Sequence, residues 1–269
     1  MSGYVTRAVP AVGLRHPDRN PCHLPAHDPD PAYAHPVLHI IDARTGAPVP
    51  ARRGPTRVEA HVPGYDGTAL RVLLVADVLA RALEIGGTPV WSLLSAERDR
   101  AELRAGAAAL GVRPFEDGRD SGPGTGGSQV VHVAGEGGAT PDGVRVAVAP
   151  VTGAPEGADP GVLRLALLSS RHGLPVRLDA AALSEADDTL VRWRRAVAAW
   201  AREPSKPVPE DVRGELRTAW EDDLDVPGVL RVLRRVEASD LPAGARFETY
   251  AYADRLLGLE LTRDLGTLA

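Results

Sequence analysis

The fold is decided by residues 58–94, which read VEAHVPGYDGTALRVLLVADVLARALEIGGTPVWSLL. Residues 58–62 alternate apolar and polar side chains, a pattern that predicts a strand. The apolar run from 69 to 85 predicts a helix, with Thr68 as its N-cap and a Gly-Gly pair after its last turn. The short apolar run at 89–94 predicts a buried parallel strand. We therefore expect a strand–loop–helix–strand unit, the start of a parallel α/β domain.

The neighbouring segments extend this unit in both directions. Ser95 is the expected cap of a further helix that ends at Leu110, and a low-complexity, glycine-rich stretch follows at 118–128. Three more strands are expected at residues 37–42, 129–133 and 144–148. The front half therefore reads as an α/β domain.

The chain changes character near residue 155, where helical patterns take over. Five helices are expected, at residues 160–169, 179–202, 212–220, 227–236 and 245–257. In the fourth of them, Val229, Val232 and Leu233 show the i, i+3, i+4 spacing that indicates an antiparallel bundle. The expected organisation is a poorly ordered arm at 1–36, an α/β domain at 37–155 and a helical bundle at 156–269.

The amino-acid composition excludes several classes of functional site. The 269 residues contain one lysine, Lys206, and one cysteine, Cys22, so 30 of the 31 basic residues are arginine. A single cysteine excludes a disulfide framework and a multi-cysteine zinc or iron–sulfur site, and Lys206 stands outside any Walker-type phosphate loop. The net charge of −5 argues against a large nucleic-acid surface. No apolar run is long enough to span a membrane and no secretory leader is recognisable, so we expect a cytoplasmic protein.

Two features allow a binding function beside a plainer interpretation. The glycine-rich residues 122–128 could cradle a phosphate, but without a lysine or a clear strand–helix context they are better explained as a flexible linker. Cys22, His23, His27 and His35 could bind a metal, but their spacing matches no closed zinc pattern. We therefore favour a solvated arm there.

Three strings of residues point to a known family. Residues 159–170 read DPGVLRLALLSS, residues 222–227 read DDLDVP, and residues 77–83 read DVLARAL. They resemble, respectively, the segment after the KMSKS loop, the Asp-Asp-Leu-Asn-Thr-Pro turn and the first Rossmann helix of cysteinyl-tRNA synthetases and of the related cysteine ligase of mycothiol biosynthesis. Further similar segments lie at 38–46, 110–114 and 253–259. The resemblance implies a shrunken Rossmann-like class I synthetase core followed by a helical bundle, without an anticodon-binding domain.

The resemblance implies activation of cysteine with ATP, followed by transfer to tRNA or to an amino sugar. The family's HIGH signature, whose histidines contact the ATP phosphates at a helix N-terminus, falls on Asp66, Gly67 and Thr68. Both histidines are absent, and the Asp66 carboxylate would repel phosphates by several kcal/mol at an effective dielectric constant of about 20. Arg71 falls on the family's following arginine. These four residues, together with Arg145, are the expected remnants of a nucleotide site.

The other two chemical sites of the family are also altered. The KMSKS loop, whose lysines stabilise the departing pyrophosphate, falls on residues 145–149, where Arg145 stands for the first lysine and Val148 for the second. The family's zinc site takes two cysteines, a histidine and a glutamate. The strand-end loop near His61 looks about four residues short in this comparison, and Cys22 matches no ligand position. We therefore expect no zinc, and ATP or an adenylate as the candidate ligand.

Three hypotheses follow. The first is a degenerate paralogue, a pseudoenzyme that has lost ordinary cysteine activation and binds a protein partner or an adenylate-like ligand. The second is an active ATP-dependent ligase for cysteine or another amino acid, in which Arg71 and Arg145 hold ATP. The third is a structural subunit that docks on a partner through residues 1–36. The acidic chain without an anticodon-binding domain argues against tRNA as a partner.

Overall fold

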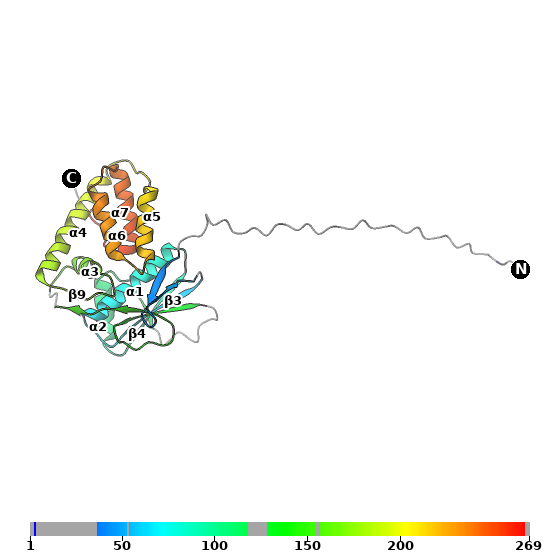
Figure 1. The fold of residues 1–269 in the computed structure, drawn as a ribbon. Helices are drawn as coiled ribbons and strands as arrows, with labels where there is room; N and C mark the ends of the chain where they lie inside the picture. The colour runs from blue at the N-terminus through cyan, green and yellow to red at the C-terminus, as the bar shows by residue number, and fades with distance from the viewer. Residues whose placement is uncertain (1–2, 4–36, 53, 118–127, 154–156, 267–269) are drawn as a thin grey trace. The chain divides into compact units, whose positions relative to one another are not determined.

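The computed structural model describes residues 3, 37–52, 54–117, 128–153 and 157–266 (Figure 1). The expected arm at 1–36 lies outside these residues except for Gly3, and Cys22 with its neighbouring histidines and nearly all of the glycine-rich stretch lie outside them too. Residues 36–269 form one compact unit, which is the one described below. No described helix combines the length and the apolar character needed to cross a membrane.

A five-stranded parallel sheet forms the centre of the front half. Its strands lie side by side in the order β5 (Glu116–Asp117), β4 (Val90–Ala96), β3 (Thr56–Val62), β6 (Gln129–Gly135) and β7 (Val144–Val148). Counted along the chain, these five strands have the order 3-2-1-4-5, as in one half of a Rossmann fold. The expectation of a Rossmann-like α/β core is confirmed, and the strand order reverses between β3 and β6.

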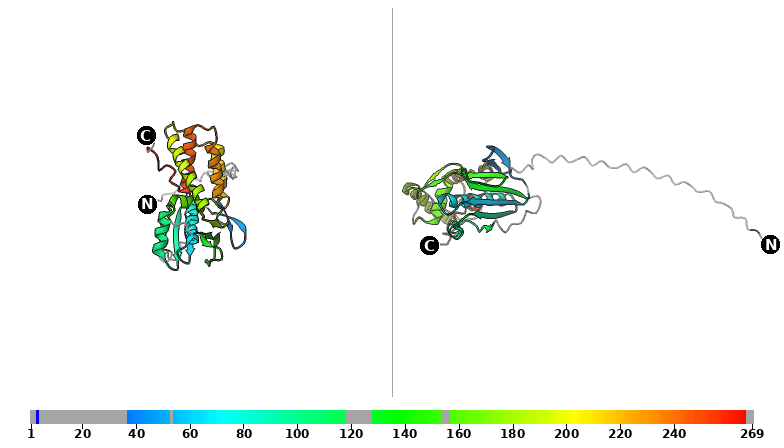
Figure 2. Two further views of the ribbon diagram at one scale, coloured as in Figure 1. Left: turned by 90° about the vertical axis from the view of Figure 1, so that its left-hand side faces the viewer. Right: turned by 90° about the horizontal axis from the view of Figure 1, so that it is seen from below.

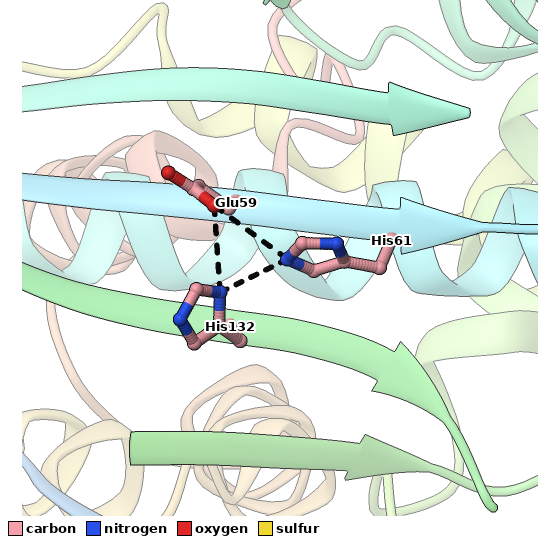
Figure 3. A group of neighbouring side chains, drawn as sticks. All are labelled: Glu59, His61 and His132. Atoms are coloured by element: carbon pink, nitrogen blue, oxygen red, sulfur yellow. Dashed lines mark hydrogen bonds and ion pairs between the residues drawn. The ribbon is translucent and has the colours of Figure 1, made fainter. Parts of the chain in front are cut away.

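One face of the sheet is covered by helix α1 (Gly67–Ile85). This helix is apolar over most of its circumference and packs against β3, β4, β6 and β7, with α2 (Arg100–Ala109) beside it. The sheet side chains of the shared core are apolar, and most are valines: Val58, Ala60, Val62, Leu94, Ala96, Val131, Val133, Val146 and Val148. The opposite face carries the polar side chains Arg57, Glu59, His61, His132 and Arg145, beside the apolar Leu93, Val130, Ala134 and Ala147. Figure 3 shows three of these side chains on the side of the strands away from α1.

The polar face follows from a short connection. Residues 136–143 join the parallel strands β6 and β7 without a helix, although such a connection usually takes a dozen or more residues. Gly137, at φ +70°, and Gly143, at φ +153°, supply the backbone conformations that this tight return needs. In a doubly wound sheet this connection would place a helix on the second face. Here that face keeps its polar strand residues instead.

A hairpin links the sheet to the helical half. Strands β1 (His39–Asp42) and β2 (Ala47–Pro50) pair antiparallel around a turn that contains Gly46. The Asp42 carboxylate accepts the backbone N–H of Arg145 at 3.2 Å, and the Ile41 N–H donates to Asp223 at 2.8 Å. A second small sheet pairs β8 (Val151–Thr152) with β9 (Val176–Arg177).

The five expected helices of the back half are all present, and they gather on one side of the α/β part (Figures 1 and 2). They are α3 (Pro160–Leu168), α4 (Ala180–Trp200), α5 (Glu210–Glu221), α6 (Val226–Glu237) and α7 (Ala243–Leu257). Tyr250 anchors their core. Its ring meets Trp193 and Trp200 edge-on, at centroid distances of 5.6 and 5.1 Å, and its hydroxyl donates to the Leu233 carbonyl at 2.9 Å.

Two expected helix starts are wrong. Asp66 caps α1, because its carboxylate accepts the Ala69 N–H at 2.6 Å, and Thr68 lies inside the first turn. Ser95 belongs to β4, which runs further than expected, and α2 begins only after Asp99. The strands β2, β5, β8 and β9 are additional, and with two to four residues each they are too short to show a period in the sequence.

A buried carboxylate joins the two halves. Asp77 on α1 accepts hydrogen bonds from Arg164 of α3 at 3.0 Å, from Arg81 at 2.8 Å and from Arg113 at 2.9 Å. Burial alone would raise the pKa of Asp77, but the charges of Arg164 and Arg81 and the hydrogen bonds from Arg113 and Arg164 lower it. The Arg164 guanidinium also donates to the carbonyls of Leu110 and Leu257, at the ends of α2 and α7.

The substitution Asp77→Asn should therefore destabilise the chain strongly. It removes the charge that compensates the fully buried Arg164 guanidinium, and breaking a buried pair from one side costs about 3–5 kcal/mol. Urea unfolding at neutral pH measures this loss. The control Asp187→Asn, at an exposed position of α4, should change the free energy of unfolding by less than about 0.5 kcal/mol. Equal effects of the two substitutions would contradict the assignment.

Candidate functional site

The candidate site lies where the strand order of the parallel sheet reverses. Open α/β sheets bind ligands outside the carboxyl ends of their strands at this point, which here falls between β3 and β6. The start of α1 follows β3 directly, and the polar face of the sheet runs along both strands. The nucleotide-binding residues expected from the sequence and a further group of polar side chains both lie around this strand pair.

The first turn of α1 is closed by its own chain. The carboxylate of Asp66 accepts the Ala69 N–H, so an anion already sits on the positive end of the helix. The hydroxyl of Thr68 accepts the backbone N–H of Val151 at 3.1 Å. A Cβ at Gly67 would lie only 3.3 Å from the Val151 side chain. The contacts of this turn are therefore made with β8 and with its own capping aspartate.

Arg71 is buried rather than aimed at a ligand, with a relative exposure of 1%. One terminal nitrogen donates to the carbonyls of Ala149 and Leu174 at 3.0 and 2.6 Å, and the other to those of Ser170 and Arg171 at 3.3 and 2.8 Å. Burial lowers the pKa of Arg71 to about 10, which leaves it charged at neutral pH. The guanidinium thus fastens α1 to the loops after β7 and α3, and both of its terminal nitrogens are committed to carbonyls.

Arg145 lies on the polar face of the sheet and reaches the carboxyl end of β6. Its Nη2 donates to the Gly135 carbonyl at 3.1 Å, and its buried Nε faces no partner among the described residues. A Cβ at Gly135 would lie 3.8 Å from the Thr68 methyl group. The structure therefore brings Arg145 and the first turn of α1 to the same end of β6, whereas Arg71 is held against carbonyls elsewhere.

Three polar side chains that the sequence did not single out converge on the polar face of β3 and β6 (Figure 3). His61 Nε2 lies 2.9 Å from His132 Nδ1, and Glu59 Oε2 lies 3.6 Å from the first nitrogen and 3.5 Å from the second. Glu59 and His61 are two residues apart on β3, and His132 is the register partner of Glu59 on β6. We call Glu59, His61 and His132 the sheet-face cluster.

The sheet-face cluster holds neutral imidazoles at neutral pH. Burial lowers the pKa of His61, the charge of His132 lowers it further, and Glu59 partly offsets both. Burial also lowers the pKa of His132, against the opposing effects of Glu59 and of a hydrogen bond to the Asp142 backbone carbonyl. Charged or polar side chains on a parallel strand are the signal that could have found this cluster, since such strands are normally apolar on both faces.

A second histidine with a shifted pKa, His172, lines the same cavity as Arg71. Both ring nitrogens of His172 face oxygens, with Nδ1 at 3.0 Å from the Ala147 carbonyl and Nε2 at 3.2 Å from the Asp223 carboxylate. Only the doubly protonated ring donates on both sides. Burial opposes the charge, but the hydrogen bond and charge of Asp223, together with the Ala147 carbonyl, raise the pKa of His172.

The stabilisation from His172 should consequently depend on pH. A histidine whose pKa is raised by folding stabilises fully below its unfolded value of about 6.5, and this contribution disappears as the pH rises through the folded value. We expect the stability lost in His172→Gln to be larger at about pH 6 than at about pH 9, as measured by urea unfolding. The substitution Asp223→Asn should remove most of the same pH-dependent difference. A loss independent of pH would refute the ion pair.

Comparison with known proteins identifies relatives for part of the chain. No family model matches it. Several curated proteins, each named L-cysteine:1D-myo-inositol 2-amino-2-deoxy-alpha-D-glucopyranoside ligase, are similar to a segment of it. The protein of Parafrankia sp. is 43% identical over 89 residues, which are 33% of this chain and 19% of that protein. The protein of Streptosporangium roseum is 38% identical over 109 residues, 39% of this chain and 26% of that protein.

The similar segment thus spans only about a fifth to a quarter of these ligases. The protein of Streptomyces griseus, 37% identical over 111 residues, gives the same picture, with 39% of this chain and 26% of that protein covered. The resemblance inferred from the sequence is confirmed within these limits. Over part of its length, this chain is a relative of the cysteine ligases of the cysteinyl-tRNA synthetase-like family.

Proposed function

We propose that this chain is a ligand-binding relative of the cysteine ligases that does not activate cysteine with ATP. The observation that carries this proposal is the closed first turn of α1, where the Asp66 carboxylate occupies the helix end that would face phosphates. Adenylation requires cationic donors for the charge that develops on pyrophosphate. Both terminal nitrogens of Arg71 already donate to backbone carbonyls. The buried Val148 lies at the position where the resemblance implies a lysine.

The same surroundings support binding of an adenylate-like ligand. Arg145 places a guanidinium at the carboxyl end of β6, beside the strand-order reversal, and its Nε has no partner among the described residues. An adenylate carries one phosphate charge, which one arginine can balance. It therefore requires less of the site than the triphosphate of ATP.

A ligase that uses ATP is the alternative, and the placement of Arg145 is the observation that favours it. In this case Arg145 alone would contact the nucleotide, because Arg71 is held by the loops after β7 and α3. Docking on a protein partner through residues 1–36 remains a third hypothesis, and these residues lie outside the described part of the chain except for Gly3.

An exchange assay decides between the first two functions. We expect the chain to give no incorporation of labelled pyrophosphate into ATP with cysteine, because the Asp66 carboxylate and the committed Arg71 leave Arg145 as the single cation for the charge of pyrophosphate. Robust exchange that is lost in Arg145→Gln would overturn the proposal and establish the ligase. The substitution Arg195→Gln, at an exposed position of α4, is the matched control.

Thermal unfolding tests whether the chain binds an adenylate-like ligand through Arg145. A non-hydrolysable cysteinyl-adenylate mimic at 100 times its Kd would stabilise the chain by about 2.7 kcal/mol, and the melting temperature would rise by several degrees. We expect this rise in the parent chain and in Arg195→Gln, and a much smaller one in Arg145→Gln. Equal rises in both variants would remove Arg145 from the binding site.

A further inference from the structure

We propose that the sheet-face cluster of Glu59, His61 and His132 binds one divalent transition-metal ion of the zinc class. The proposal is independent of the function proposed for the end of β6, because it concerns side chains of the strands themselves. Its donors also differ from the set that the resemblance implies, which needs two cysteines. The only cysteine of the chain is Cys22, outside the described residues.

The spacing of the three donor atoms fits a tetrahedral ion. Zinc bonds of about 2.0–2.1 Å to nitrogen or oxygen place two ligand atoms of a tetrahedron about 3.3 Å apart. The three observed separations are 2.9, 3.5 and 3.6 Å. One atom of each side chain therefore lies at the corner of a triangle that such an ion spans with small side-chain adjustments. Figure 3 shows the three groups pointing toward a common point in front of β3 and β6.

The neighbours of the cluster hold its donors in the orientation that a metal needs. Nδ1 of His132 faces both Glu59 and His61, so it is the ring nitrogen that an ion in the cluster would meet. In the tautomer that carries its proton on Nε2, the lone pair of Nδ1 is directed at the cluster. Glu59 pairs with Arg57 through Oε1, which leaves Oε2 for the ion. A hydrogen bond behind the carboxylate is a usual support of a metal ligand.

The backbone keeps room for the His132 ring. Gly143 lies so close that a Cβ there would come within 2.9 Å of Cδ2 and 3.0 Å of Nε2 of this ring. Its φ of +153° further restricts the position to glycine. The return loop between β6 and β7 thus presses against the ring on the side opposite the donors, and Glu59 and His132 face one another across paired strands. Side chains fixed on strands give a metal site more precise geometry than loop residues do.

The donor set selects the class of ion. Two imidazoles and one carboxylate suit zinc and neighbouring transition metals, whereas magnesium and calcium prefer oxygen donors throughout. Three protein ligands leave one position of a tetrahedral ion for water or for a ligand. Glu59 and His61 keep 13% and 14% of their side chains exposed, so the ion has a route to the cluster from solvent.

Calorimetric titration of the full chain, prepared without a histidine tag, with Zn²⁺ tests the proposal. We expect one ion per chain and, with Co²⁺ instead, the intense visible absorption of tetrahedral cobalt. Loss of a direct ligand should exceed the 10–100-fold cost of removing a supporting group. The affinity should therefore fall by at least about 100-fold in His61→Gln, His132→Gln and Glu59→Gln. Circular dichroism checks that each variant is folded, and Glu59→Gln keeps the shape of the side chain in case a histidine variant is not.

Two controls separate this site from other ligands of the chain. His39→Gln changes an exposed histidine of β1, and Cys22→Ser removes the only thiol, so both variants should bind as the parent does. Saturable binding that survives in Glu59→Gln and His132→Gln but is lost in Cys22→Ser would overturn the proposal in favour of the arm. No saturable binding to the parent would show that the 2.9 Å contact is a hydrogen bond between imidazoles and would overturn it as well.

Discussion

The fold depends on satisfying one buried carboxylate. Asp77 lies in the middle of α1, the helix that covers the sheet, and an ionised group there is tolerated only because three guanidinium groups donate to it. The geometry of those donors fixes α3 and the loop after α2 against α1. Arg164 also donates to the carbonyls at the ends of α2 and α7. The Asp77–Arg164 pair therefore fixes the placement of four helices, α1, α2, α3 and α7. The two halves consequently share a single hydrophobic core.

The second constraint is the eight-residue return between β6 and β7. Because it carries no helix, the sheet is layered by α1 on one side and has polar strand residues on the other. A parallel strand with alternating polarity is unusual, and here it places imidazole, carboxylate and guanidinium groups on adjacent strands. The short return therefore provides the polar face, and the strand-order reversal between β3 and β6 sets which side chains meet on it.

Local patterns predicted what local physics determines. The apolar length of α1, the strand at 144–148 and the five helices of the back half follow from periodicity and appear close to their expected bounds. The prediction that Thr68 caps α1 was wrong, because Asp66 and Thr68 are both good capping residues and lie two positions apart. Only the hydrogen bond between Thr68 and Val151 decides between them. The sheet-face cluster was missed because Glu59 and His132 meet only through the lateral order of the strands. That order is a property of the whole chain.

The four carbonyls around Arg71 have a consequence for any redesign of this protein. Its four acceptors come from the loops after β7 and α3. The arginine therefore joins helix α1 to residues that are about 80 to 100 positions away along the chain. Introducing histidines at the start of α1 would leave these hydrogen bonds in place. Freeing the Arg71 guanidinium to bind a phosphate would require both loops to be rebuilt together with the helix start. The packing therefore restricts which changes the helix start tolerates, because the arrangement of both loops depends on the hydrogen bonds of Arg71.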